Sequence, residues 1–229
     1  MEETRAYEEL RVGFTAAVSH ELRTPLARLL ALLESASLPD ADGEALLAQA
    51  REQVEEMSEL VDDVLFLSEL ESGREVVALG STAALPVLEE VRDRLADSAE
   101  RADVSIRIDA DADVELPLRR RMLQIVAENL AENSIRYAGP GSTLTLSARD
   151  GVLEAADDGR GVEEDELPRL FERFYRSDRA RASRGTGLGL AIVKHVVTAA
   201  GGEVEATDGP GHGLTVQCRF SMSAPSSAS

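Results

Sequence analysis

The stretch RRRMLQIVAENLAENSIRY, residues 119–137, decides the fold, because a helical pattern and two asparagines share one face there. The apolar residues recur at helical spacing and define an inward arc: Met122, Ile125, Val126 and Leu130. Asn129 and Asn133 fall inside that arc. Burying two carboxamides costs about 1–3 kcal/mol each unless something bonds them. Structural asparagines of a core remain an alternative; we favour a ligand site, since a carboxamide oxygen suits Mg²⁺.

Asp157 ends a predicted strand over residues 152–157 and is followed by Gly159 and Gly161. These glycines allow the backbone to approach a planar ligand closely. A carboxylate at the end of a strand can accept a hydrogen bond from an exocyclic amine of such a ligand. Asp157-Asp158-Gly159 taken alone is typical of a simple turn. It indicates a ligand site only in combination with the other motifs of the chain.

A second glycine motif, Gly185-Thr186-Gly187-Leu188-Gly189-Leu190, leads into a predicted helix over residues 191–200. Its backbone N–H groups and the helix N-terminus suit an anion such as phosphate. Its spacing differs from the dinucleotide-binding fingerprint, and the Gly-Lys-Ser/Thr of a P-loop is missing. Six arginines precede it: Arg169, Arg173, Arg176, Arg179, Arg181 and Arg184. They can supply positive charge for a phosphate; a solvated basic loop is the alternative.

His20 lies in the motif SHELRTPL, residues 19–26, within a predicted helix. Thr24 is one turn further on the same face, and the apolar stripe points elsewhere, so we expect an exposed imidazole. Pro25 predicts a kink just beyond it. An exposed imidazole beside the carboxylate of Glu21 suits a nucleophile with an acid/base partner, although an isolated exposed histidine is usually only solvated. Ser19, His20 and Glu21 cannot form a hydrolytic triad, because adjacent helical side chains diverge.

Residues 1–74 are predicted to form two long amphipathic helices joined by a turn at residues 38–43. Two such helices carry more apolar stripe than a hairpin can bury alone. We therefore expect a homodimer in which two hairpins form a four-helix bundle. Packing of both stripes on the rest of the chain is the alternative.

Residues 75–220 have the pattern of an α/β sandwich. Helices are predicted over residues 85–99, 119–137 and 191–200. Strands are predicted over residues 104–108, 143–149, 152–157, 203–206 and 214–220. Asp150-Gly151 is a strong turn signal and joins two of these strands as a hairpin. Residues 221–229 are rich in serine and alanine, and we expect a disordered tail.

The composition indicates a soluble enzyme of a reducing, cytoplasmic compartment. The formal net charge of the 229 residues is −19, which argues against nucleic acid as a partner. Cys218 is the single cysteine and excludes an intrachain disulfide; its place in an alternating stretch predicts a buried strand residue. No apolar run approaches the roughly 18 residues that span a bilayer, and no signal peptide is recognisable.

Taken in order, these motifs resemble the catalytic core of bacterial two-component sensor histidine kinases, over about residues 8–220. Residues 19–26 resemble the phosphoacceptor box of that family, and residues 119–137 resemble its asparagine box. Residues 157–161 and 185–190 resemble its first and second glycine boxes, and residues 170–176 its phenylalanine box. Residues 209–215 match the last glycine box more weakly.

The resemblance implies a helical dimerisation domain followed by a Bergerat-type ATP-binding domain, with ATP and Mg²⁺ as cofactors. It implies that His20 is the phosphoacceptor, Glu21 its acid/base partner, Asn133 the magnesium ligand and Asp157 the adenine contact. Thr24 is implied in dephosphorylating the partner, an aspartate-bearing response regulator. The remaining nucleotide contacts implied are Asn129, Arg136, Tyr137, Gly159, Gly161, Gly185, Thr186, Gly187, Leu188 and Gly189.

Three departures from the family pattern stand out: Arg136 replaces a lysine, Asp158 an asparagine and Arg160 a proline. Asp158 adds negative charge near the nucleotide, which is expected to weaken binding. Family members usually carry an upstream sensor, often with membrane helices. We therefore expect an excised cytoplasmic core; a sensor that is a separate protein is the alternative. Two rival functions remain open: a nucleotide-binding dimeric scaffold, and an ATPase or ATP-dependent switch without phosphotransfer.

Overall fold

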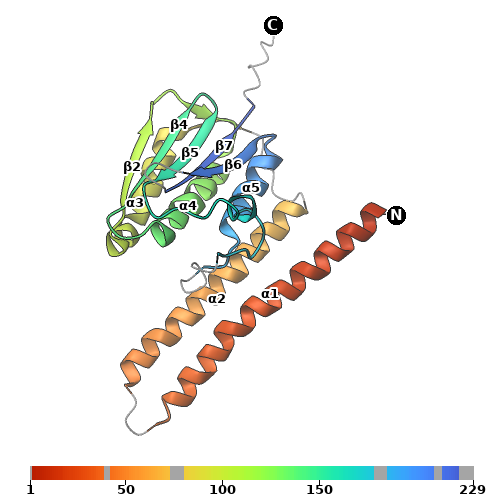
Figure 1. Ribbon diagram of the computed structural model, residues 1–229, viewed down its shortest axis with the longest axis vertical. Helices are drawn as coiled ribbons and strands as arrows, with labels where there is room; N and C mark the ends of the chain where they lie inside the picture. The colour runs from red at the N-terminus through yellow and green to blue at the C-terminus, as the bar shows by residue number, and fades with distance from the viewer. Residues whose placement is uncertain (1, 39–41, 73–79, 178–184, 209–212, 222–229) are drawn as a thin grey trace. The chain divides into compact units, whose positions relative to one another are not determined.

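The computed structural model describes residues 2–38, 42–72, 80–177, 185–208 and 213–221 (Figure 1). Side chains of the first helix are described from residue 17 onward. Contacts divide the chain into two units: Met1–Ser68 with Arg184–Thr186, and Glu69–Ser183 with Gly187–Ser229. No helix among the described residues is long and apolar enough to cross a membrane. Of the predicted disordered tail, all but Ser221 lies outside the described residues.

The first unit contains a helical hairpin, as predicted, formed by α1 (Glu2–Ser35) and α2 (Gly43–Glu71). The helix α1 continues through Pro25, so the proline does not end it. Asp42 caps α2, because its Oδ1 accepts the backbone N–H of Ala45 at 3.1 Å. Large apolar side chains that stay exposed in the single chain occur only here among the described residues: Leu26, Leu30, Leu33, Leu38, Leu47, Val54, Val61 and Leu65. Such a surface needs a partner.

The second unit is the predicted α/β sandwich, built on a sheet with the strand order β2-β4-β5-β7-β6. Its strands are β2 (Ser105–Ala110), β4 (Thr143–Arg149), β5 (Val152–Asp157), β6 (Glu203–Asp208) and β7 (Leu214–Arg219). Its helices are α3 (Ala84–Ala102), α4 (Arg120–Tyr137) and α5 (Gly189–Ala199). The strands β2 and β4 pair in parallel, and the other pairs are antiparallel. The three helices cover one face of the sheet (Figure 1).

Burial along the strands alternates, which separates the two faces of the sheet. Leu144, Leu146 and Ala148 of β4 are buried, whereas the residues between them are half-buried. Leu153 and Ala155 of β5 repeat this pattern. Because side chains alternate across a strand, the buried set packs under the helices and the other set lies on the outer face.

Several boundaries differ from the prediction, for local reasons. The helix α3 runs to Ala102, three residues beyond the predicted end, and stops where Asp103 adopts a left-handed conformation (φ 56°) that bonds back to Ala99 and Glu100. The sequence pattern missed a small pair, β1 (Thr82–Ala83) with β3 (Glu115–Leu116), and the 3₁₀ turn η1 (Leu167–Arg169).

Cys218 is fully buried on β7, as its alternating context predicted. Burial raises the pKa of the Cys218 thiol to about 12, because the thiolate would lose its hydration there. The thiol is therefore a small apolar core residue and has no part in chemistry near neutral pH.

Candidate functional site

Asp157 is the one carboxylate buried in the part of the chain that the structure describes, with 3% of its surface exposed. It follows Leu153 and Ala155 on the covered side of β5, so the strand's alternation places its side chain under the helices. A buried carboxylate is stable only when it is well bonded. Asp157 Oδ1 accepts the backbone N–H groups of Gly159 (3.0 Å) and Leu214 (3.2 Å). Its Oδ2 accepts the hydroxyl of Ser134 at 2.9 Å.

Gly213 passes so close to Asp157 that no side chain fits between them. A Cβ built at Gly213 would lie 1.9 Å from the carbonyl oxygen of Asp157 and 2.8 Å from its Oδ1. The close approach is what brings the N–H of Leu214 within reach of the carboxylate. The motif pattern had placed Gly213 only within the weak match to a last glycine box, and its contact with Asp157 was not foreseen.

Asn129 and Asn133 lie on α4, half-buried beside the fully buried Met122, Val126 and Leu130. Asn129 Nδ2 donates to the carbonyl of Ile125 at 2.8 Å, which fixes the carboxamide. Its Oδ1 then faces Gly189, where a Cβ would lie only 2.7 Å away. The structure thus brings the asparagine helix and the start of α5 together.

Asn133 stands one turn beyond Asn129. Among the residues that the structure describes, it has no hydrogen-bond partner, so its carboxamide is available to a ligand. Arg136 is exposed and Tyr137 is half-buried at the C-terminal end of the same helix. These four predicted site residues therefore share α4.

The second glycine motif joins the phenylalanine segment through backbone contacts. Phe174 N–H donates to the carbonyl of Gly187 at 2.9 Å. Phe174 itself has φ 62°, a conformation that a bulky residue adopts only when its surroundings enforce it. Leu188 is buried, and among the described residues no side-chain hydrogen bond caps α5, which begins at Gly189. Uncapped N–H groups at a helix start can bind an anion.

The predicted arginine cluster is only partly described, since Arg179, Arg181 and Arg184 lie outside the described residues. Arg169 stacks over the ring of Tyr175, 4.3 Å from its centroid. The hydroxyl of Tyr175 donates to Glu166 at 3.1 Å. Burial, together with that hydrogen bond, raises the pKa of Tyr175. Arg169 thus has a structural partner and is a weaker candidate for phosphate than the sequence implied.

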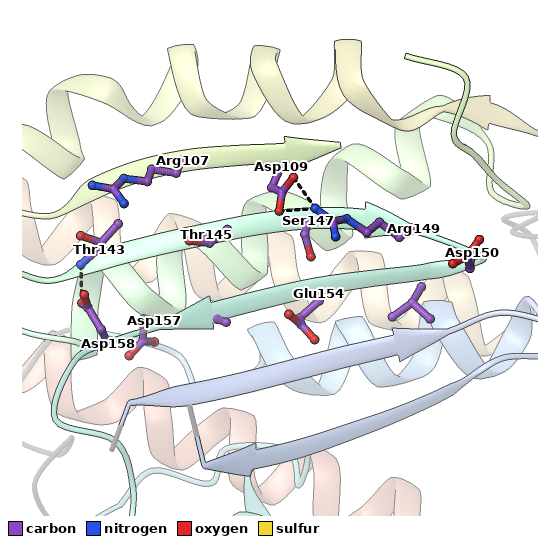
Figure 2. A pocket seen from close by; sticks show the side chains of 12 residues that line it. Arg107, Asp109, Thr143, Thr145, Ser147, Arg149, Asp150, Glu154, Asp157 and Asp158 are labelled. Carbon is purple, nitrogen blue, oxygen red and sulfur yellow. Dashed lines mark hydrogen bonds and ion pairs between the residues drawn. The ribbon is translucent and has the colours of Figure 1, made fainter. Parts of the chain in front are cut away.

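A cavity of about 560 Å³ lies on the outer face of the sheet, over β2, β4 and β5 (Figure 2). Asp158 points into it, and its Oδ1 accepts the backbone N–H of Thr143 at 2.5 Å. Arg149 pairs with Asp109 at 2.5 Å in the same cavity, and that hydrogen bond raises the pKa of Arg149. The carboxylate of Asp158 therefore bonds the start of β4. Its expected weakening of nucleotide binding stays a prediction.

His20 belongs to the first unit, on α1. His20 and Thr24 are exposed, Glu21 is half-buried and Pro25 is buried. The predicted exposure of the imidazole is thus confirmed. An exposed imidazole with a carboxylate as its sequence neighbour can act as a nucleophile towards a phosphoryl group.

Two family models match the chain. Residues 10–73 match the His Kinase A (phospho-acceptor) domain, and residues 118–224 match the histidine kinase-, DNA gyrase B- and HSP90-like ATPase domain. The first match contains His20, and the second contains the asparagines, Asp157 and both glycine motifs.

Curated relatives extend the similarity over most of the chain. Sensor-like histidine kinase SenX3 of Mycobacterium tuberculosis is 33% identical over 218 residues, which cover 91% of this chain and 53% of the relative. Phosphate regulon sensor protein PhoR of Pseudomonas aeruginosa is 37% identical over 224 residues, covering 93% and 50%. The chain thus spans about half the length of the curated relatives it matches.

Solved structures agree with the fold. Acinetobacter baumannii histidine kinase AdeS matches with a TM-score of 0.73 and 27% identity, covering 89% of this chain and 98% of that one. Histidine kinase ThkA in complex with response regulator protein TrrA matches with a TM-score of 0.75 over 96% of this chain and 64% of that one. Its identity of 19% supports a shared fold alone.

Proposed function

Since the chain belongs to the histidine kinase family, as the cytoplasmic core of a two-component sensor kinase, we propose that it transfers the γ-phosphoryl group of ATP to its own His20. The phosphoryl group then passes to an aspartate of a response-regulator receiver domain. One observation carries the proposal: an exposed imidazole lies within the segment that matches a phosphoacceptor domain, in the same chain as an ATPase-type domain. By their names, SenX3 is a sensor-like histidine kinase and PhoR is a phosphate regulon sensor protein.

The nucleotide lies on the helix side of the sheet in this proposal. Asp157 accepts the exocyclic amine of adenine, and the phosphates extend towards Gly187, Leu188 and the start of α5. This placement is supported by the buried, bonded carboxylate of Asp157 and by the contact of Asn129 with Gly189. Gly159 and Gly161 line the adenine base. Arg136 and Tyr137 lie near the phosphates and the adenine ring.

Asn133 holds Mg²⁺ in this proposal. A carboxamide oxygen suits this hard cation, and the half-buried side chain of Asn133 lacks a partner among the described residues, so the donor fits. When bound with ATP, Mg²⁺ neutralises phosphate charge and orients the terminal phosphoryl group.

In the transfer step, an imidazole nitrogen of His20 forms a bond to the γ-phosphorus as the bond from phosphorus to the ADP oxygen breaks. Glu21 is the acid/base partner in this proposal; because adjacent helical side chains diverge, the proton that the ring releases reaches it through a water molecule. The exposure of His20 supports this role, because the nucleophile must be reached by a nucleotide held on another domain. Thr24, exposed one turn further, positions water for dephosphorylation of the regulator.

A homodimer is the proposed assembly. The exposed apolar side chains of α1 and α2 form the largest unsatisfied surface in the described chain, and a second copy of the hairpin would bury them in a four-helix bundle. Sedimentation of the intact chain should give a dimer. Residues 1–74 expressed alone should dimerise too, whereas a monomeric fragment of intact helicity would contradict the bundle.

Incubation with γ-labelled ATP and Mg²⁺ tests the function directly. Phosphohistidine is expected, seen as label on the protein that is acid-labile and stable to alkali. Release of labelled phosphate without label on the protein would favour an ATPase switch. Binding of ATP with neither outcome would favour a dimeric scaffold.

A further inference from the structure

The buried hydroxyl of Ser134 has one described acceptor, and that acceptor is Asp157. The residue is 4% exposed on α4, directly after Asn133. A serine inside a helix usually bonds the carbonyl four residues earlier. Here the hydroxyl instead reaches a strand residue 23 positions along the chain. Alanine is the better helix former, so the helix alone does not account for a serine at this place.

The acceptor sites of Asp157 can be counted. A carboxylate offers about two lone-pair sites on each oxygen. Oδ1 already accepts two N–H groups, from Gly159 and Leu214, and is filled. Oδ2 accepts the hydroxyl of Ser134 and keeps a single site. That site can take one N–H of an exocyclic amine.

We propose that Ser134 is a positioning residue for base selection, which holds Asp157 so that one directed acceptor faces the 6-amino group of a purine. The proposal rests on the proposed role of Asp157 as the adenine contact. A purine with a 6-carbonyl presents an acceptor to this oxygen and is repelled. Without the hydroxyl, Oδ2 has two open sites and is held only through the two bonds to Oδ1, so its lone pair is less well directed and the bond to the amine weakens.

The test compares two nucleotides on the intact chain. ATP carries the 6-amino group, and purine riboside 5′-triphosphate lacks it but has the same sugar and phosphates. Ser134→Ala should weaken ATP binding by about tenfold, as for one hydrogen bond to a charged group, and leave the amine-free analogue within about twofold. If Ser134→Ala only damaged the structure, binding of both nucleotides would weaken equally, and that result would overturn the proposal.

Ser142→Ala is the matched control. Ser142 is a buried serine of the same unit, 7% exposed, whose hydroxyl donates to the carbonyl of Gly139 at 2.6 Å. It should change neither affinity. If Ser134→Ala does not fold, Ser134→Cys replaces it: its weak S–H donor should give a smaller loss that is again confined to ATP, and equal losses for both nucleotides would refute the role.

The affinities of the wild-type protein for the two nucleotides distinguish a failure of the proposed role of Ser134 from a failure of the proposed role of Asp157. Preference for ATP over the amine-free analogue supports the role of Asp157. Equal affinities would mean that Asp157 does not read the amine, so both proposals fail. A wild-type preference that Ser134→Ala leaves unchanged would overturn the role of Ser134 alone.

Discussion

Asp157→Asn should weaken ATP binding while the fold stays intact, because the amide can replace the carboxylate in some of its bonds but not in all of them. The amide oxygen can still accept from Gly159 and Leu214, as Oδ1 does now. The amide nitrogen then occupies the place of Oδ2, and the hydroxyl of Ser134 can rotate to accept from it. The amine of adenine meets a donor in place of an acceptor.

The magnitude follows from that exchange. Loss of one hydrogen bond to a charged group costs about 1.5–3 kcal/mol. This corresponds to a rise in the Kd for ATP of about 10- to 150-fold. The free energy of unfolding should change by less than about 1 kcal/mol, since the buried N–H groups keep an acceptor.

Titration calorimetry with ATP measures the affinity, and thermal unfolding without nucleotide measures the stability. An Asp157→Asn protein that binds ATP within twofold of the wild type would refute the adenine contact. A protein that loses binding and stability together would show that the carboxylate acts mainly as a structural acceptor.

Three further substitutions test other parts of the site. His20→Gln should abolish acid-labile label and leave ATP affinity within about twofold, because the imidazole lies outside the proposed nucleotide site; label of normal intensity would exclude His20 as the acceptor. Thr24→Ala should keep most autophosphorylation and lose phosphatase activity towards the regulator; loss of both activities, or of neither, would favour a purely structural role beside Pro25. Gly189→Ala places a Cβ 2.7 Å from Asn129 Oδ1. It should lower the free energy of unfolding, measured with denaturant, by about 1–3 kcal/mol and should weaken ATP binding. If neither stability nor ATP affinity changes, the Asn129 side chain moves aside at no cost and the contact is unimportant.

The sequence predicted the local elements well where two signals agree. Alternation and the Asp150-Gly151 turn together gave β4 and β5 with their observed bounds, and the start of α4 differs by one residue. The strands β1 and β3 have two residues each, too few for any periodicity, and exist because Thr82 pairs with Leu116 across the fold. Such pairs depend on tertiary structure alone.

Within the site, the hydrogen-bond partners of Asp157 likewise could be predicted from the sequence only where they are close to it in the chain. Gly159 is two residues away and was visible in the motif, whereas Ser134 and Leu214 come from elements 23 and 57 positions distant. No spacing rule predicts those contacts. The orientation of Asp158 was accessible, however: it follows an inward residue, and a period of two places it on the opposite face of the sheet.

In the proposed site, the three bonds to Asp157 also couple nucleotide binding to the completeness of the fold. Their donors come from α4, from the turn after β5 and from the first residue of β7, so the acceptor is oriented only when all three segments have assembled. A ligand that binds this assembled state alone stabilises it by about 2.7 kcal/mol at 100 times its Kd. Saturating ATP should therefore protect the amide hydrogens of β7 against exchange, although that strand reaches the carboxylate through a single N–H group.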